Sequence, residues 1–221
     1  MMLKPGRYTI VTFGDSITAP REDEKTGRKL RVYSDVLRDE LPKHGITGEV
    51  INQGIGGNHT RDAIERFERD VLDHNPDLVI FMYGMNDSAL DVWKDPPVTE
   101  PRVPRDEFIA NLTHMVRALK TRSAKIILIT PNPRRWSPGI LALYGKPPYD
   151  PADPMGFNYL HADYAQAVRD VAAKEKATLV DVYNLFWVRP DLDQLLSDGV
   201  HLNDAGQQVV AEAILKAMEV T

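Results

Sequence analysis

The sequence predicts an α/β protein in which a parallel sheet lies between two layers of helices. Short β-branched apolar runs alternate with longer amphipathic segments, and this alternation implies βαβ crossovers. The runs are nearly continuous in apolar residues, as expected of strands that are buried on both faces of a parallel sheet. The chain has 221 residues with no linker and no internal repeat, and we therefore expect a single domain over residues 1–221.

Five apolar runs are the predicted strands. In chain order they are YTIVTF from Tyr8, EVINQ from Glu49, DLVIFMY from Asp77, KIILIT from Lys125 and ATLVDV from Ala177. The amphipathic segments between and after them predict helices over residues 33–43, 62–73, 105–121, 159–174 and 204–218. Asp204 is the expected N-cap of the last helix, because a short acidic side chain can accept a hydrogen bond from the first turn.

Three long irregular stretches follow predicted strands. They are APREDEKTGRKLR (residues 19–31), VWKDPPVTEPRVP (92–104) and PNPRRWSPGILALYGKPPYDPADPMG (131–156). Long loops without secondary structure of their own are often functional. Each leaves the carboxyl end of a strand, where open α/β sheets bind ligands, so we expect a binding rim; surface decoration is the alternative.

Composition and charge exclude several classes of protein. The formal charge is -5 and the pI is near 5.7, with Lys and Arg scattered among acidic residues, which argues against binding to nucleic acid or to an anionic membrane surface. The chain has no cysteine, which excludes disulfides, thiolate catalysis and cysteine-ligated metals. No apolar window is long enough for a membrane span and no signal peptide is visible, so we expect a cytoplasmic protein.

Two short motifs at opposite ends of the chain suggest a nucleophile and its base. FGDSIT places Ser16 in a turn directly after the first strand, although a serine there is more often a helix cap or a turn residue. A serine hydroxyl attacks only when a base takes its proton and a third group orients that base. DGVHL would supply both, with His201 as the base and Asp198 on its second ring nitrogen. A capping histidine and an Asx turn are the alternative.

Acyl transfer also requires hydrogen-bond donors directed at the developing oxyanion. NQGIGGNHT follows the second strand with glycines whose N–H groups can approach a ligand, and YGMND follows the third strand with the amide of Asn86. Each block alone is weak, but a parallel sheet brings these strand ends to one edge. The other five histidines show no spacing typical of a metal site and are expected to be solvated or packed: His44, His59, His74, His114 and His161.

Together, the blocks GDSIT, NQGIGGNHT, YGMND and DGVHLN resemble the GDSL esterases, also called SGNH hydrolases, in which they occur in this order. The resemblance implies a three-layer α/β/α sandwich with a five-stranded parallel sheet, a flavodoxin-like arrangement. It also implies that Ser16 is the nucleophile, that His201 is the base and that Asp198 orients this base.

The same resemblance assigns the oxyanion donors. The Ser16 N–H would act together with a glycine N–H and the side chain of Asn86. Gly57 is favoured over Gly56, because the family's donor usually precedes Asp or Asn and here Asn58 follows Gly57. Neither a cofactor nor a metal is expected. Three further positions resemble the family's supporting residues: Asp15, Thr18 and Asp87.

The expected reaction is hydrolysis of a small O-acyl ester, with acetyl the favoured acyl group and a carbohydrate or small alcohol as the other part. A lysophospholipase or thioesterase with longer acyl chains is an alternative, for which GILALY could line a groove. A non-catalytic flavodoxin-like module that binds phosphate or flavin is another. The sequence does not indicate an oligomeric state. The long loops carry rings, beside Arg134 and Arg135, that would either stack on a sugar or cover the edge of the core: Trp93, Trp136, Tyr144, Tyr149, Phe157 and Tyr159.

Overall fold

One five-stranded sheet forms the centre of the protein, seen in a computed structural model that describes residues 3–22 and 27–219. All neighbouring strands are parallel and their order is β2-β1-β3-β4-β5, which confirms the predicted fold class. The order reverses between β1 and β3, so the loops after these two strands diverge and leave room for a ligand between them. The strands are β1 (Gly6–Gly14), β2 (Ile46–Gly54), β3 (Leu78–Met82), β4 (Lys125–Ile129) and β5 (Thr178–Val180).

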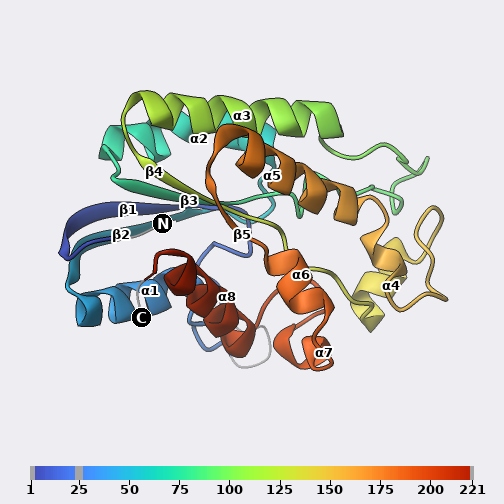
Figure 1. Ribbon diagram of the computed structural model, residues 1–221. Coiled ribbons are helices and arrows are strands. Elements are labelled where there is room, and N and C mark those ends of the chain that lie inside the picture. The colour runs from blue at the N-terminus through green and yellow to red at the C-terminus, as the bar shows by residue number, and fades with distance from the viewer. Residues whose placement is uncertain (1–2, 23–26, 220–221) are drawn as a thin grey trace.

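Helices cover both faces of the sheet (Figure 1). On one face lie α1 (Tyr33–Glu40) and α8 (Asp204–Ala217), and on the other lie α2 (Thr60–Asp70), α3 (Arg105–Thr121) and α5 (His161–Glu175). Within the described ranges, no helix is long and apolar enough to cross a bilayer. The shorter elements are α4 (Pro138–Tyr144), α6 (Val182–Trp187), α7 (Leu192–Leu195) and the 3₁₀ turns η1 (Leu41–His44), η2 (Leu72–His74) and η3 (Gly156–Asn158).

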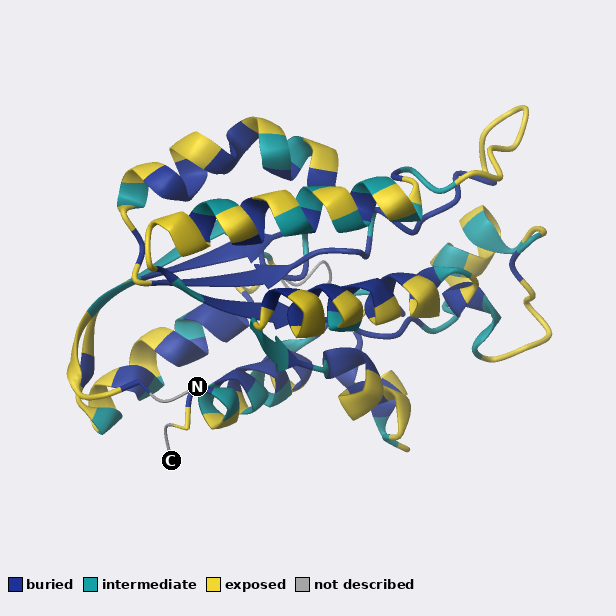
Figure 2. Cartoon of the chain, turned by 45° about the horizontal axis from the view of Figure 1, so that its top comes forward, coloured by how far each residue is buried: buried dark blue, intermediate teal, exposed yellow. Residues whose placement is uncertain are grey.

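Alternate residues of the central strands face the two helix layers. Along β3, Leu78, Ile80 and Met82 pack toward α1 and α8, whereas Val79 and Phe81 pack toward α2, α3 and α5. Every residue of β3 is buried, and Figure 2 shows the middle of the sheet in the colour of buried residues. The expectation of burial on both faces is wrong for β2, an edge strand in which all residues but the first are exposed or half-buried.

Local polar contacts create helical turns that the apolar pattern does not predict. The stretch 131–156 is not wholly irregular, because Ser137 caps α4 and a proline occupies its first turn. Helix α2 begins at Thr60, two residues before the predicted start. Here the Asp62 carboxylate accepts the His59 N–H at 2.9 Å and extends the helix toward the N-terminus. Helices α6 and α7 were not predicted either.

The start of α8 corrects one prediction about capping. The N-cap is Asn203, whose Oδ1 accepts the Gly206 N–H at 3.0 Å. Asp204 is therefore wrong as the N-cap and is instead the first residue of the helix. Its carboxylate points to the segment before α1, where it accepts the Arg31 N–H at 3.0 Å.

Helix α8 links the last part of the chain to the first. The buried side chain of Gln207 accepts the Tyr33 N–H at 2.9 Å and donates to the Ile17 carbonyl at 2.8 Å. These two hydrogen bonds span 174 and 190 positions of the sequence. They hold the turn after β1 against α8, so the loop that precedes α8 lies beside the carboxyl end of β1.

The three long loops leave the carboxyl edge of the sheet, as predicted. Residues 19–31 follow β1, 92–104 follow the end of β3, and 131–156 follow β4, although residues 23–26 of the first lie outside the described residues. The 92–104 loop folds back on the chain before it: Leu90 and Pro101 form an isolated antiparallel bridge. This return places the end of the loop beside the turn that follows β3.

Candidate active site

The turn after β1 presents Ser16 at the carboxyl edge of the sheet. The chain folds back there, with the Thr18 N–H donating to the Asp15 carbonyl at 3.1 Å. Gly14 is required at the end of the strand, because a Cβ at this position would lie 2.2 Å from Thr18 Oγ1. This turn leaves Ser16 half-buried, while its neighbours Asp15 and Ile17 are buried.

A chain of hydrogen bonds joins Ser16 to His201 and Asp198. The Ser16 Oγ lies 2.9 Å from His201 Nε2, and His201 Nδ1 lies 2.6 Å from Asp198 Oδ2. The other carboxylate oxygen of Asp198 accepts the N–H groups of Val200 and His201 at 2.9 and 2.8 Å. These contacts fix the carboxylate, and the carboxylate fixes which ring nitrogen faces Ser16.

The surroundings of Asp198 favour its ionised form. Burial opposes the charge, but the hydrogen bond and the charge of His201, together with two backbone N–H groups, hold the pKa of Asp198 well below its ordinary value. Arg21 Nη2 lies 4.0 Å from the same Oδ2 and adds positive charge nearby. An ionised Asp198 accepts a hydrogen bond from the Nδ1–H of His201, which leaves Nε2 without a hydrogen and able to accept the proton of Ser16.

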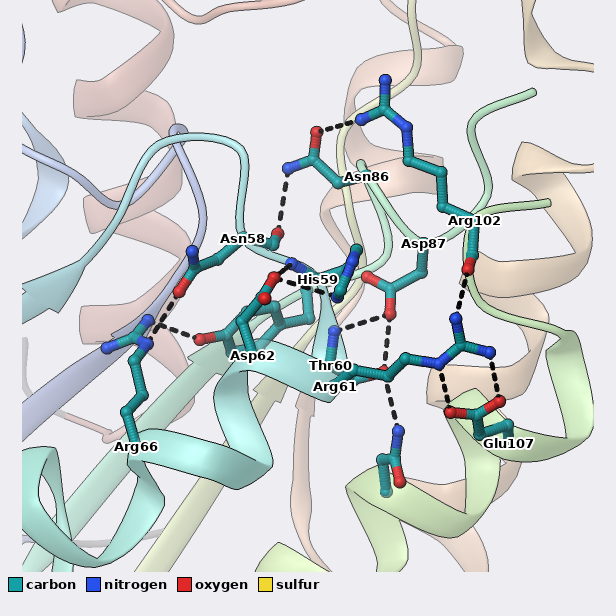
Figure 3. A network of polar contacts seen from close by, with 12 residues as sticks. Asn58, His59, Thr60, Arg61, Asp62, Arg66, Asn86, Asp87, Arg102 and Glu107 are labelled. Carbon is teal, nitrogen blue, oxygen red and sulfur yellow. Dashed lines mark hydrogen bonds and ion pairs between the residues drawn. The ribbon is translucent and has the colours of Figure 1, made fainter. Parts of the chain in front are cut away.

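The glycine turn at the end of β2 (residues 54–57) and Asn86, which follows β3, lie beside Ser16. Gly57 has a φ of 79°, in the left-handed region that favours glycine, and a Cβ on Gly56 would lie 3.9 Å from the Ser16 Cβ. Among the described residues, neither the Ser16 N–H nor the Gly57 N–H has a hydrogen-bond partner. Asn86 donates one Nδ2 hydrogen to the Asn58 carbonyl at 3.0 Å (Figure 3), which leaves the other free. The choice of Gly57 over Gly56 stays a prediction.

Asp87 joins the turn after β3 to the start of α2. Its buried carboxylate accepts the N–H and the hydroxyl of Thr60, at 2.8 and 2.6 Å, and the Gly84 N–H at 3.1 Å. Figure 3 shows this contact between Asp87 and Thr60. Burial raises the pKa of Asp87, while the hydrogen bonds from Thr60 oppose the shift. This carboxylate therefore brings Asn86 and the glycine turn together.

The buried side chains of Asp15 and Thr18 stabilise the turn around Ser16. Asp15 is 1% exposed and accepts the Ile17 N–H at 2.9 Å. Burial raises the pKa of Asp15 to about 7. The Thr18 hydroxyl lies 2.9 Å from the Tyr33 hydroxyl, in the first turn of α1. All three residues predicted to support the site are thus buried beneath the turns that carry Ser16 and Asn86.

A pocket of about 160 Å³ opens beside the Ser16 hydroxyl. Ile140, Tyr144 and Phe157 contribute apolar surface to it, so the long loop after β4 forms part of the rim as expected. GILALY lies on α4 and contributes two of these side chains. Within residues 3–22 and 27–219, no group of three or more histidine or acidic side chains is arranged to hold a metal ion.

Arg134 brings a buried cation into the wall of the pocket. It is 2% exposed, its Nη2 donates to Ser88 Oγ at 2.9 Å and to the Met85 carbonyl, and its guanidinium lies 5.0 Å from the centre of the Phe157 ring. In the described part of the chain no carboxylate forms an ion pair with Arg134, and its Nη1 has no hydrogen-bond partner. Burial lowers the pKa of Arg134.

Most of the aromatic side chains in the long loops pack against one another. Trp136, Tyr144, Tyr149 and Phe157 form ring contacts with centroid distances between 5.0 and 6.5 Å. They cover a small core of their own, which favours the packing interpretation over sugar stacking for these four rings. Trp93 and Tyr159, in contrast, are 44% and 49% exposed.

Sequence reasoning missed two arginines that hold side chains at the site, Arg66 and Arg102. Arg102 donates to the Oδ1 of Asn86 at 3.3 Å, and Arg66 donates to the Oδ1 of Asn58 at 2.7 Å (Figure 3). An arginine on an exposed-looking loop, or within an amphipathic helix, carries no local pattern that would mark such a contact. Only the folded chain shows that they hold the two asparagines.

A serine, histidine and aspartate joined by hydrogen bonds at the carboxyl edge of a parallel sheet are typical of α/β serine hydrolases. The chain belongs to the GDSL-like lipase/acylhydrolase family, whose family model matches residues 12–209. The resemblance seen in the four sequence blocks is thereby confirmed, and the chain is a carboxylic ester hydrolase.

Known relatives agree with this assignment. An isoamyl acetate-hydrolyzing esterase 1 homolog from Bos taurus is 34% identical over 213 residues, covering 91% of this chain and 77% of that protein. An acetylxylan esterase from Geobacillus stearothermophilus is 32% identical over 187 residues, covering 82% of this chain and 76% of that protein. The crystal structure of an acetylxylan esterase from that species has a TM-score of 0.73 at 27% identity, covering 98% of this chain and 96% of that chain. Further structures are catalytic mutants of this enzyme with a serine, aspartate or histidine replaced by alanine.

Proposed function

We propose that the chain hydrolyses small O-acyl esters, above all acetyl esters of a carbohydrate or small alcohol, through an acyl-enzyme on Ser16. The observation that carries the proposal is the hydrogen-bonded chain from Asp198 through His201 to the Ser16 hydroxyl, at the mouth of a pocket. The catalytic serine, aspartate and histidine mutants of the Geobacillus esterase support these three roles.

In this mechanism Ser16 Oγ attacks the ester carbonyl while His201 Nε2 takes the hydroxyl proton. Asp198 stabilises the imidazolium that forms. The N–H groups of Ser16 and Gly57 and the free Nδ2 hydrogen of Asn86 bind the oxyanion of the tetrahedral intermediate. His201 then protonates the leaving alcohol, and a water molecule that gives its proton to the same ring releases the acid.

The pocket favours a short acyl group. Its volume is about 160 Å³, and its wall contains the guanidinium of Arg134 without an ion-pair partner among the described residues. A long alkyl chain packed against this wall would offer no acceptor to the buried Nη1 of Arg134, which has no hydrogen-bond partner among the described residues, and this is unfavourable. The acetylxylan esterase and the isoamyl acetate-hydrolyzing esterase 1 homolog are both named for acetyl esters, which supports the same choice.

The catalytic roles are tested with alanine variants and p-nitrophenyl acetate. Ser16→Ala and His201→Ala should each lower kcat by a factor on the order of 10⁴–10⁶, with the far-UV circular dichroism unchanged. His114→Ala is the matched control, because His114 is exposed on α3, away from the pocket, and its loss should leave kcat unchanged. Hydrolysis retained in Ser16→Ala would rule the mechanism out.

The acyl group is tested by comparing kcat/KM for the p-nitrophenyl esters of acetate, butyrate and octanoate. We expect the acetate to be hydrolysed fastest. Release of acetate from acetylated xylo-oligosaccharides and from isoamyl acetate then distinguishes a carbohydrate from a small alcohol. A higher kcat/KM for the octanoate would instead favour the lysophospholipase or thioesterase alternative.

A further inference from the structure

The side-chain amide of Asn86 is held from both ends. Its Nδ2 donates to the Asn58 carbonyl at 3.0 Å, and its Oδ1 accepts from Arg102 Nη1 at 3.3 Å (Figure 3). Rotating the amide by half a turn would direct its N–H groups at the guanidinium and its oxygen at a carbonyl oxygen, so both contacts would become repulsive. The two contacts therefore fix the amide with its second Nδ2 hydrogen available to a ligand.

Arg102 is itself fixed in place by contacts that need no ligand. Its Nε and Nη2 both donate to one carboxylate oxygen of Asp91, at 2.9 and 2.7 Å. Its N–H donates to the Ala89 carbonyl at 3.0 Å, and its own carbonyl accepts from Arg61 Nη1 at 3.0 Å. Figure 3 shows Arg61 between this carbonyl and Glu107. The Nε and Nη2 of Arg61 donate to the two carboxylate oxygens of Glu107 at 2.5 and 2.6 Å. The guanidinium thus presents Nη1 to the amide in one geometry.

We propose that Arg102 is a positioning residue for the oxyanion: it fixes and polarises the amide of Asn86, which donates to the tetrahedral intermediate. The positive charge of the guanidinium beside Oδ1 draws electron density toward this oxygen, so the Nδ2 hydrogen becomes a stronger donor. Asp91 keeps the guanidinium in place. The inference rests on the proposed function, in which Asn86 is one of three oxyanion donors.

Direct contact between Arg102 and the substrate is the competing role, because this side chain also lines the pocket and is 27% exposed. The two roles differ in how the effect of Arg102 depends on Asn86. A residue that acts through the amide loses its effect when the amide is removed. A residue that binds the substrate keeps its effect, because the two contributions are independent.

A double-mutant cycle separates these roles, using the full chain and p-nitrophenyl acetate. Asn86→Ala should lower kcat by about 10²-fold, and Arg102→Met by roughly 10-fold with KM changed less than about 2-fold. In the Asn86→Ala background, Arg102→Met should lower kcat by less than about 2-fold. Arg105→Met is the matched control: its side chain is 40% exposed and pairs with Asp170, so kcat should stay unchanged.

Two results would overturn the proposal and assign Arg102 to substrate binding. One is a 10-fold loss that persists in the Asn86→Ala background, and the other is a raised KM at unchanged kcat. If Arg102→Met does not fold, Arg102→Lys replaces it. Lysine lacks the planar fork through which Arg102 contacts Asp91 by Nε and Nη2 and Asn86 by Nη1, so kcat should fall by a smaller factor, and an unchanged kcat would equally overturn the proposal. Failure of the proposed function looks different: Ser16→Ala would then hydrolyse the ester as fast as the wild type.

Discussion

Replacing Asp15 with asparagine should make the stability of the protein less sensitive to pH. Burial raises the pKa of Asp15 from 3.8 to about 7; the charge of Asp87 acts in the same direction, while the Ile17 N–H and the charge of Arg134 oppose it. Asparagine has the same shape, and its Oδ1 can still accept the Ile17 N–H. The substitution therefore removes the titrating group with little change in packing.

The direction of this pH dependence follows from the pKa of Asp15 in the folded and in the unfolded chain. The folded protein binds this proton more tightly than the unfolded chain, so the contribution of Asp15 to stability is complete below about pH 4 and is lost as the pH rises to about 7. The difference between 3.8 and about 7 corresponds to ~4 kcal/mol of unfolding free energy. Integrated over the titration, roughly 2–3 kcal/mol of this is lost between pH 5 and pH 8. Asparagine does not titrate, so the variant should not show this loss of unfolding free energy.

The measurement is urea unfolding at pH 5 and pH 8, followed by tryptophan fluorescence. Relative to the wild type, Asp15→Asn should gain roughly 2–3 kcal/mol of unfolding free energy on going from pH 5 to pH 8. Asp73→Asn, at an exposed position in η2, is the control and should show no such change. A difference between Asp15→Asn and wild type that is the same at both pH values would refute the reasoning.

The cap of α8 and the wall of the pocket allow two further tests. Asn203→Ala should lower the unfolding free energy by about 1 kcal/mol, because the Gly206 N–H loses its acceptor; Glu212→Ala, exposed on the same helix, should cost less than half of that, and equal losses would contradict the assignment. Arg134→Met replaces the cation in the pocket wall with an apolar side chain and should raise the butyrate-to-acetate ratio of kcat/KM roughly 10-fold. The reason is that butyrate has two more methylene groups than acetate, and each contributes about 0.8 kcal/mol when it is buried against an apolar wall. Arg135→Met, which removes an exposed pair with Asp193, should leave this ratio unchanged.

The central elements of the fold were predictable because their apolar residues are continuous or periodic. The run from Asp77 contains β3, and the helix predicted over residues 105–121 is α3 with the same bounds. The errors lie where polar contacts decide. Asn203 and Asp204 are both good capping residues, and only the fold shows which one faces the first turn of α8. Helix α4 has no buried residue, so it lacks the apolar periodicity on which the prediction depends.

The candidate site was predictable to the extent that it follows from topology. Ser16 and Asn86 come directly after neighbouring parallel strands, so their meeting at one edge follows from the sheet alone. Arg102 and Arg134 could not be inferred in this way. Their contacts depend on how the 92–104 and 131–156 loops fold back over the edge, and that path is set by tertiary packing rather than by local sequence.

The hydrogen bonds of Gln207 bear on the point during synthesis at which the enzyme can first hydrolyse an ester. Ser16 and His201 are separated by 185 positions, and a nascent chain leaving the ribosome exposes the hydroxyl long before the imidazole exists. On the proposed mechanism an incomplete chain is inactive, because Ser16 has no base until α8 packs against the turn that follows β1. The time at which ester hydrolysis first appears during synthesis or refolding would therefore report this docking, and an unfinished chain would hydrolyse no ester.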